Sequence, residues 1–119
     1  MRGRWAVTAC LLGLTVLSSG RVAAQEPKGS IDTRVVLEND EVTVALLTFP
    51  PGSASGNHVG LETEMGIVVE GELTLETPSG REVLGPGAVK WLPALTPHDA
   101  RNEGTTPLKL WVVLFKRSR

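Results

Sequence analysis

Alternation of hydrophobic and polar side chains with a period of two recurs along the chain after residue 32, and it predicts β-strands with one buried face. In residues 72–76 the two leucines are expected to point inward, whereas Thr74 and the two glutamates point outward. This part of the chain lacks the ~3.6-residue period of an amphipathic helix. Strands are predicted at residues 33–38, 42–49, 65–70, 72–76, 81–84, 88–92 and 108–115.

Turn-forming residues separate these strands at intervals of roughly ten residues. Pro50 and Pro51 end one strand, because proline has no N–H to donate to a neighbouring strand. Residues 108–115 are apolar on both alternating faces apart from Lys109, so we expect them to be covered on both sides, within a closed barrel or by a partner subunit. Short strands with glycine and proline corners predict an all-β sandwich or barrel.

The first 24 residues have a different character. Arg2 and Arg4 precede a short apolar run at residues 9–17, and small residues follow up to Ala24. This layout predicts a cleavable signal peptide at residues 1–24, and therefore export to the bacterial periplasm or beyond the cell. The run is shorter than the roughly 20 residues that span a bilayer, so we expect no membrane attachment after cleavage. An uncleaved anchor or a buried helix is the alternative.

The remaining chain is predicted to be a solvated linker at residues 25–32 and a single domain at residues 33–119. Cys10 is removed with the signal peptide, which excludes disulfides, thiolate ligands and a cysteine nucleophile from the mature protein. Residues 1–24 hold three of the 12 basic residues and none of the 13 acidic ones, so the mature net charge is −4. This charge argues against nucleic acid or an anionic membrane as a partner.

The chain contains two histidines, His58 and His98, and each lies beside a predicted turn at the end of a strand. Two carboxylates, those of Glu62 and Glu64, follow His58 within six residues. A histidine considered alone is more often an ordinary surface or core residue than a ligand. The spacing of these residues relative to the surrounding glycines is what makes them candidates for a site.

The first of two spacing patterns resembles the first motif of the cupin family, which runs Gly, five residues, His, one residue, His, three or four residues, Glu, six residues, Gly. In this chain Gly52 is followed after five residues by His58, and Glu64 is followed after six residues by Gly71. The one departure is Gly60, which stands where the family has its second histidine.

The second pattern resembles the second cupin motif, which runs Gly, five residues, Pro, one residue, Gly, two residues, His, three residues, Asn. Here Gly87 is followed after five residues by Pro93, and His98 is followed after three residues by Asn102. Leu95 stands where a glycine is usual. The resemblance implies a cupin jelly-roll β-barrel, also called a double-stranded β-helix.

In that family the motif side chains hold a divalent ion of iron, manganese, nickel, copper or zinc inside the barrel. The resemblance therefore implies a metal site at His58, Glu64 and His98, with no organic cofactor. The loss of a ligand at Gly60 leaves a set of two histidines and one carboxylate, which suffices for non-haem iron chemistry. We expect water to take the place of the missing fourth ligand. Alternatively Glu62, predicted to lie on the same strand face as Glu64, could take it. Alternatively, the site has decayed and the barrel binds an organic ligand or nothing.

The cupin family is functionally diverse, so the fold alone does not define an activity. The first hypothesis is a metal-dependent enzyme acting on a small organic molecule, such as a dioxygenase or an isomerase. The second is a non-catalytic small-molecule-binding protein, and the third is an accessory protein with a filled barrel. Small cupins are commonly dimers, so the resemblance also implies a homodimer. A serine–histidine–aspartate triad is excluded, because His98 and Asp99 are strand neighbours that point to opposite faces.

Overall fold

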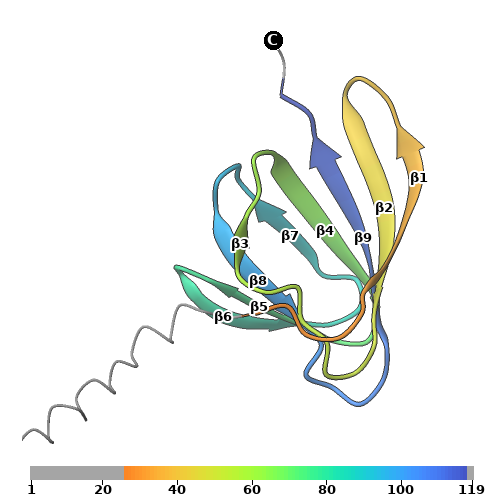
Figure 1. Ribbon diagram of the computed structural model, residues 1–119, viewed down its shortest axis with the longest axis vertical. Coiled ribbons are helices and arrows are strands. Elements are labelled where there is room, and N and C mark those ends of the chain that lie inside the picture. The colour runs from red at the N-terminus through yellow and green to blue at the C-terminus, as the bar shows by residue number, and fades with distance from the viewer. Residues whose placement is uncertain (1–25, 118–119) are drawn as a thin grey trace, which may run out of the picture.

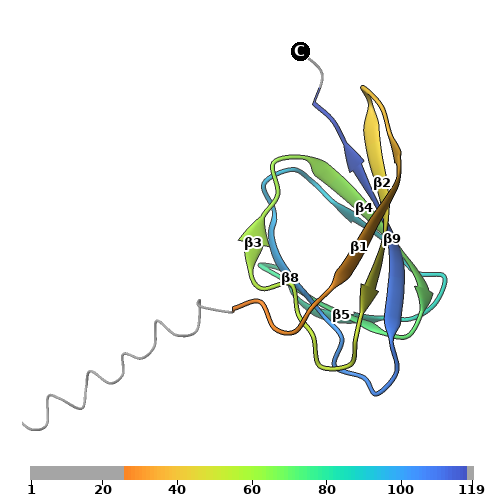
Figure 2. The ribbon, with the colours of Figure 1, turned by 45° about the vertical axis from the view of Figure 1, so that its right-hand side comes forward.

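The computed structural model describes residues 26–117, and every regular element in that range is a β-strand (Figure 1). A five-stranded sheet has the order β1-β2-β9-β4-β7, and a four-stranded sheet has the order β3-β8-β5-β6. The two sheets face each other and curve into a barrel (Figure 2). The strands are β1 (Asp32–Glu38), β2 (Val42–Phe49), β3 (His58–Val59), β4 (Thr63–Glu70), β5 (Leu73–Thr77), β6 (Gly80–Leu84), β7 (Val89–Leu92), β8 (Pro97–Arg101) and β9 (Leu108–Phe115).

All the strand pairs are antiparallel, and the predicted all-β architecture is confirmed. Each of the seven predicted strands is present, with its bounds shifted by no more than two residues. The two strands that the alternation did not predict are β3, which has only two residues, and β8, which begins at Pro97 and is largely polar. β3 is held by pairing with β8, and β8 pairs with both β3 and β5, so strand pairing and not a hydrophobic pattern of their own forms them.

The hydrophobic core lies between the two sheets. Phe49 of β2 is directly opposite Leu108 of β9, and their exposed fractions are 1% and 0%. Leu110 and Val112 extend this inner face of β9, because residues two apart in a strand share a face. The other buried members of the core are Val68, Leu73, Leu75 and Leu92. The core therefore joins the central strands of the large sheet to β5 of the small one.

Thr74 lies on the face of β5 opposite the core leucines, as predicted, but it is buried there, with an exposed fraction of only 4%. Thr74 lies on β5, an interior strand of the four-stranded sheet, between Arg101 of β8 and Val83 of β6. These cross-strand neighbours flank it on the outer face of the sheet. Alternation correctly gave the inward direction of the leucines, but it cannot show how much neighbouring strands cover the opposite face.

The chain before β1 is attached to the barrel over part of its length. Lys28 and Ala54 exchange both backbone hydrogen bonds, at 2.9 and 2.8 Å, and Ile31 packs against the core. The last residues of the predicted linker at 25–32 are therefore part of the folded unit. The predicted signal peptide at residues 1–24 lies outside the described residues. Within the described range, no helix has the length and apolarity needed to cross a membrane.

Gly71 forms the corner between β4 and β5, and only glycine fits this position. Its φ of +83° lies in the left-handed region. A Cβ atom here would collide with the carbonyl oxygen of Pro107 and lie 2.8 Å from the Cα of Leu108. The close approach of the two chain segments explains why the motif glycine is retained at this corner.

Candidate functional site

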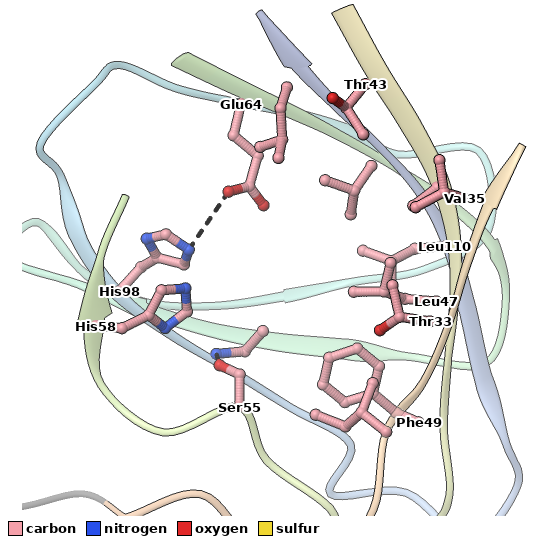
Figure 3. Close-up of a pocket in the computed structure, with 15 residues that line it drawn as sticks. Thr33, Val35, Thr43, Leu47, Phe49, Ser55, His58, Glu64, His98 and Leu110 are labelled. Carbon is pink, nitrogen blue, oxygen red and sulfur yellow. Dashed lines mark hydrogen bonds and ion pairs between the residues drawn. The ribbon is translucent and has the colours of Figure 1, made fainter. Parts of the chain in front are cut away.

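A cavity of about 430 Å³ lies between the two sheets, beside the core. Apolar side chains of β1, β2 and β9 form one wall, and Figure 3 shows Val35, Leu47 and Leu110 on this side. Figure 3 also shows His58 and His98 on the other side of the cavity and the side chain of Glu64 pointing toward His98. The cavity therefore has a polar wall and an apolar wall.

The two histidines are brought together by strand pairing. His58 of β3 and His98 of β8 are direct cross-strand partners, so their side chains lie on the same face of the small sheet. The centroids of their rings are 4.3 Å apart, with an interplanar angle of 59°. Their side chains belong to segments 40 residues apart in the sequence, and the β3–β8 register alone makes them neighbours.

Both imidazole rings are fixed by the same kind of hydrogen bond. Nδ1 of His58 lies 2.9 Å from the carbonyl oxygen of Gly56, and Nδ1 of His98 lies 2.9 Å from that of Thr96. A carbonyl oxygen only accepts, so each Nδ1 carries the proton and donates it. In the neutral ring Nε2 is then left with a free lone pair, which is the arrangement that second-sphere partners impose on histidine ligands.

Glu64 supplies a carboxylate on the same side of the cavity. It lies near the start of β4, and its side chain is 22% exposed. Its Oε1 atom is 3.7 Å from Nε2 of His98, as the dashed line in Figure 3 marks. This separation exceeds a hydrogen bond, and the two groups form an ion pair only when His98 is protonated. Glu64 thus meets the free nitrogen of His98 from the opposite sheet.

The expected substitute ligand, Glu62, is not on the cavity wall. It lies in the bend that precedes β4, so it does not share a strand face with Glu64 as predicted. The position of the missing histidine is open. A Cβ atom added at Gly60 would have the carbonyl oxygen of Glu62, at 3.8 Å, as its nearest neighbour.

The three predicted ligands line one cavity, but they are not assembled into a ligand cage. Within residues 26–117, no three histidine, cysteine, aspartate or glutamate side chains are gathered closely enough to hold a metal ion as they stand. Two ligands bound to one ion at right angles lie on the order of 3 Å apart, somewhat less than the separation of Glu64 from His98. The donor chemistry fits a divalent transition metal, and binding one requires side-chain adjustment.

A buried carboxylate that the sequence did not single out as a site residue supports the loop before His58. Asp99 is 1% exposed, and its Oδ1 atom accepts a hydrogen bond of 3.1 Å from the backbone N–H of Gly56. The carbonyl of Gly56 in turn accepts the proton of His58. Asp99 therefore helps to orient the ring of His58 indirectly, by holding Gly56 in place. As predicted, its side chain points away from the cavity that His98 faces.

The charge of Asp99 is compensated by Arg101, whose Nη1 atom donates a 2.7 Å hydrogen bond to Oδ2. Burial by itself lowers the pKa of Arg101, but the hydrogen bond to Asp99 and the surrounding carboxylates outweigh it and raise the pKa. Arg101 also pairs with Glu103, which pairs in turn with Arg81. This ion-pair network lies behind the histidine-bearing wall and stabilises it.

Comparison with solved structures gives close fold matches. A cupin domain from Bordetella pertussis Tohama I is 26% identical, with 76% of this chain and 97% of that chain covered and a TM-score of 0.65. A protein from Thermus thermophilus is 28% identical over 84% of this chain and 95% of its own, with a TM-score of 0.68. A Thermotoga maritima protein described as a predicted oxalate decarboxylase is 24% identical over 76% and 84%, with a TM-score of 0.70.

Sequence comparison agrees with the fold. No curated protein matches the chain. The family model described as "Cupin domain" matches residues 45–114, which include most of the second strand, both histidines, Glu64 and most of β9. The pairing of two sheets into a barrel, the two spaced motifs and this match agree, and the chain belongs to the cupin family.

Proposed function

We propose that the barrel cavity binds a small organic molecule at a divalent first-row transition metal ion held by His58, Glu64 and His98. The observation that carries the proposal is which nitrogen of each imidazole carries the proton. Each ring has its Nδ1 proton committed to a backbone carbonyl and its Nε2 free, on a cavity that also receives the carboxylate of Glu64. Neutral imidazole and carboxylate groups are the ligands of non-haem iron centres and related sites.

The bound ion supplies Lewis acidity or oxygen activation, as in the metal-dependent oxygenases and isomerases that we regard as the first hypothesis. The protein's own contribution is to orient the ligands and to exclude water. Gly56 and Thr96 hold the histidine rings, and the apolar wall of β1, β2 and β9 lowers the polarity around the ligand. Three protein ligands leave open positions for the molecule that binds.

The names of structural neighbours do not select a reaction. One neighbour, at 17% identity, is the polyketide cyclase RemF from Streptomyces resistomycificus, and another is the Thermotoga maritima protein described above. At such identities the likeness concerns the fold, and one fold carries many activities. The reaction is therefore left to experiment.

A second candidate function is non-catalytic binding of a small molecule in a barrel that holds no metal. Two observations favour it. Gly60 replaces one of the family's ligands, and in the described part of the chain no three potential ligands are already clustered. The cavity itself would serve this function unchanged, since its apolar wall does not depend on a metal.

Metal analysis distinguishes the two functions. Protein purified without chelators, and separately reconstituted with Fe²⁺, Mn²⁺, Ni²⁺, Cu²⁺ or Zn²⁺, is expected to retain about one equivalent of one ion. His98→Ala is expected to lose it, because His98 neighbours both other ligands. Glu62→Ala is the matched control, since its carboxylate is close in sequence but outside the cavity wall. A wild-type protein that retains no ion would support the metal-free function instead.

A further inference from the structure

The polar and apolar groups of the cavity are segregated. His58, His98 and Ser55 lie on one side, and the carboxylate of Glu64 extends toward His98 from β4 of the large sheet (Figure 3). The facing side, formed by β1, β2 and β9, carries mostly aliphatic and aromatic side chains, among them Val35, and its polar members are the hydroxyls of Thr33 and Thr43 (Figure 3). A ligand that satisfies both walls must have two chemically different ends.

The charges on the cavity wall are few and of one sign. No lysine or arginine is among the residues that line the cavity, and Glu64 is the one carboxylate there. Arg101 and Arg81 are engaged with Asp99, Glu103 and Glu76 behind the histidine-bearing wall. A divalent ion beside one carboxylate leaves a single net positive charge, which is the whole positive charge the cavity can offer an anion.

We infer that the ligand of this site is an amphipathic chelator. It has a compact head with two oxygen donors and at most one negative charge, and an uncharged apolar body. The inference rests on the proposed metal site and adds the class of molecule that the site accepts. The head binds at the open positions of the ion, and the body lies against the wall of β1, β2 and β9.

The missing ligand at Gly60 favours a head with two donors. Three protein ligands on an ion that prefers five or six leave at least two neighbouring positions. No side chain fills the space at Gly60, where an added Cβ would meet its nearest neighbour only at 3.8 Å. An enolate, catecholate or hydroxamate head can occupy two positions with one negative charge.

The apolar wall excludes a second charge on the ligand. A carboxylate or phosphate placed against Leu47 or Leu110 would lose part of its hydration and find no cation on the wall to replace it. The hydroxyls of Thr33 and Thr43, which also line the cavity, can donate to a neutral carbonyl or ether oxygen. The volume of about 430 Å³ suits one compact ligand, at the lower end of the ~300–1,000 Å³ range of ligand pockets.

Three hydroxamates with one common head test the inference. Protein loaded with Co²⁺ is titrated with acetohydroxamate, benzohydroxamate and 4-carboxybenzohydroxamate, and the dissociation constants are measured by calorimetry and by the visible spectrum of the cobalt. Each dissociation constant is divided by the dissociation constant of the same hydroxamate for free Co²⁺, which corrects for differences in the chelating strength of the head. Benzohydroxamate is expected to bind at least about tenfold more tightly than acetohydroxamate, because its ring buries apolar surface. The 4-carboxy compound is expected to bind at least about tenfold more weakly than benzohydroxamate.

A pair of arginine substitutions on adjacent residues provides the control. Val35 is 52% exposed and lines the cavity, whereas Val36 is 49% exposed, lies at the bulge of β1 and does not line it. Val35→Arg is expected to strengthen binding of the 4-carboxy compound about tenfold by giving its second charge a partner. Val36→Arg is expected to leave the order of affinities for the three hydroxamates unchanged.

The outcomes separate this inference from the proposed function. Equal corrected affinities of the three hydroxamates for cobalt-loaded protein would overturn the ligand class while leaving the metal site intact. A Val35→Arg variant that binds the 4-carboxy compound no more tightly than the wild-type protein does would overturn the position of the apolar body. Failure of wild-type protein to bind Co²⁺ or any other divalent ion would overturn the metal site, and the chelating head with it.

Discussion

The backbone N–H of Leu95 donates a 2.8 Å hydrogen bond to the carbonyl oxygen of Gly60. These two residues are the positions at which the chain departs from the two cupin motifs. Leu95 lies in the turn between β7 and β8, and Gly60 lies between β3 and β4. The bond therefore joins the two loops beside the histidine-bearing strands and reinforces the β3–β8 pairing.

Leu95→Gly is expected to stabilise the protein. Leu95 has a φ of 69°, which is unfavourable for a residue with a side chain, and its side chain is 58% exposed, so little burial is lost. Relief of the left-handed strain is worth about 1–2 kcal/mol, and the greater freedom of unfolded glycine offsets part of it. A net gain of about 0.5–1 kcal/mol is expected in urea unfolding. Leu95→Ala keeps the Cβ and should show no gain; an equal gain in both variants would contradict this account.

Gly60→His is expected to tighten metal binding at least about tenfold, because it places a third imidazole two residues after His58, where the family motif has its second histidine. The site has room for it, since the nearest neighbour of an added Cβ is 3.8 Å away. The measurement is competition with a chelating indicator for Zn²⁺ or Co²⁺. Gly60→Ala tests the effect of the Cβ alone. No tightening in Gly60→His would show that His58, Glu64 and position 60 do not converge on one ion.

Asp99→Ala is expected to destabilise the fold by about 3 kcal/mol or more, because it leaves the buried amide of Gly56 without its acceptor and removes the partner of Arg101. Chemical unfolding measures this loss. The matched control is Glu103→Ala, whose side chain is 42% exposed and which pairs with the same arginine. Its expected cost is below about 1 kcal/mol. Similar losses of stability in the two variants would mean that the burial of Asp99 does not account for its contribution to the stability of the fold.

The homodimer expected from the family resemblance can be tested on the outer face of the large sheet. Trp91 and Val89 of β7 are 55% and 59% exposed, and the Trp91 ring lies 5.4 Å from that of Phe115 on β9. We expect a second copy of the chain to cover this face and light scattering to give twice the mass of one chain. Trp91→Glu should shift the protein toward monomer. Val83→Glu, at a 59% exposed position of the small sheet, should leave the mass unchanged.

Export can be tested by mass spectrometry of the full chain expressed in a bacterium. Cleavage after Ala24 is expected to yield a mature chain that begins at Gln25, recovered from the periplasmic fraction or the medium. Ala24→Pro should block processing and leave the chain at its full mass. An intact N-terminus on the wild-type protein would instead support an uncleaved segment.

The strands whose side chains alternate could be predicted from sequence. The bounds of β2 and β9 also agree with the prediction to the residue, because each is an apolar, β-branched run next to turn-forming residues, which is a local signal. The two histidines were recognised from their spacing to glycines, and their convergence on one cavity agrees with that reading. The strands β3 and β8 carry no such pattern, because pairing between distant segments creates them.

The sequence by itself determined an all-β chain, its corners and the candidate residues His58, Glu64 and His98. Only the tertiary structure decided that Glu62 lies off the cavity, that Thr74 is buried, and that Asp99 supports Gly56 from 43 positions away. The physical reason is that alternation and turns act between near neighbours in the chain. Burial of a polar group and the meeting of donors depend on the register of strands that are distant in sequence, and no local pattern encodes that register.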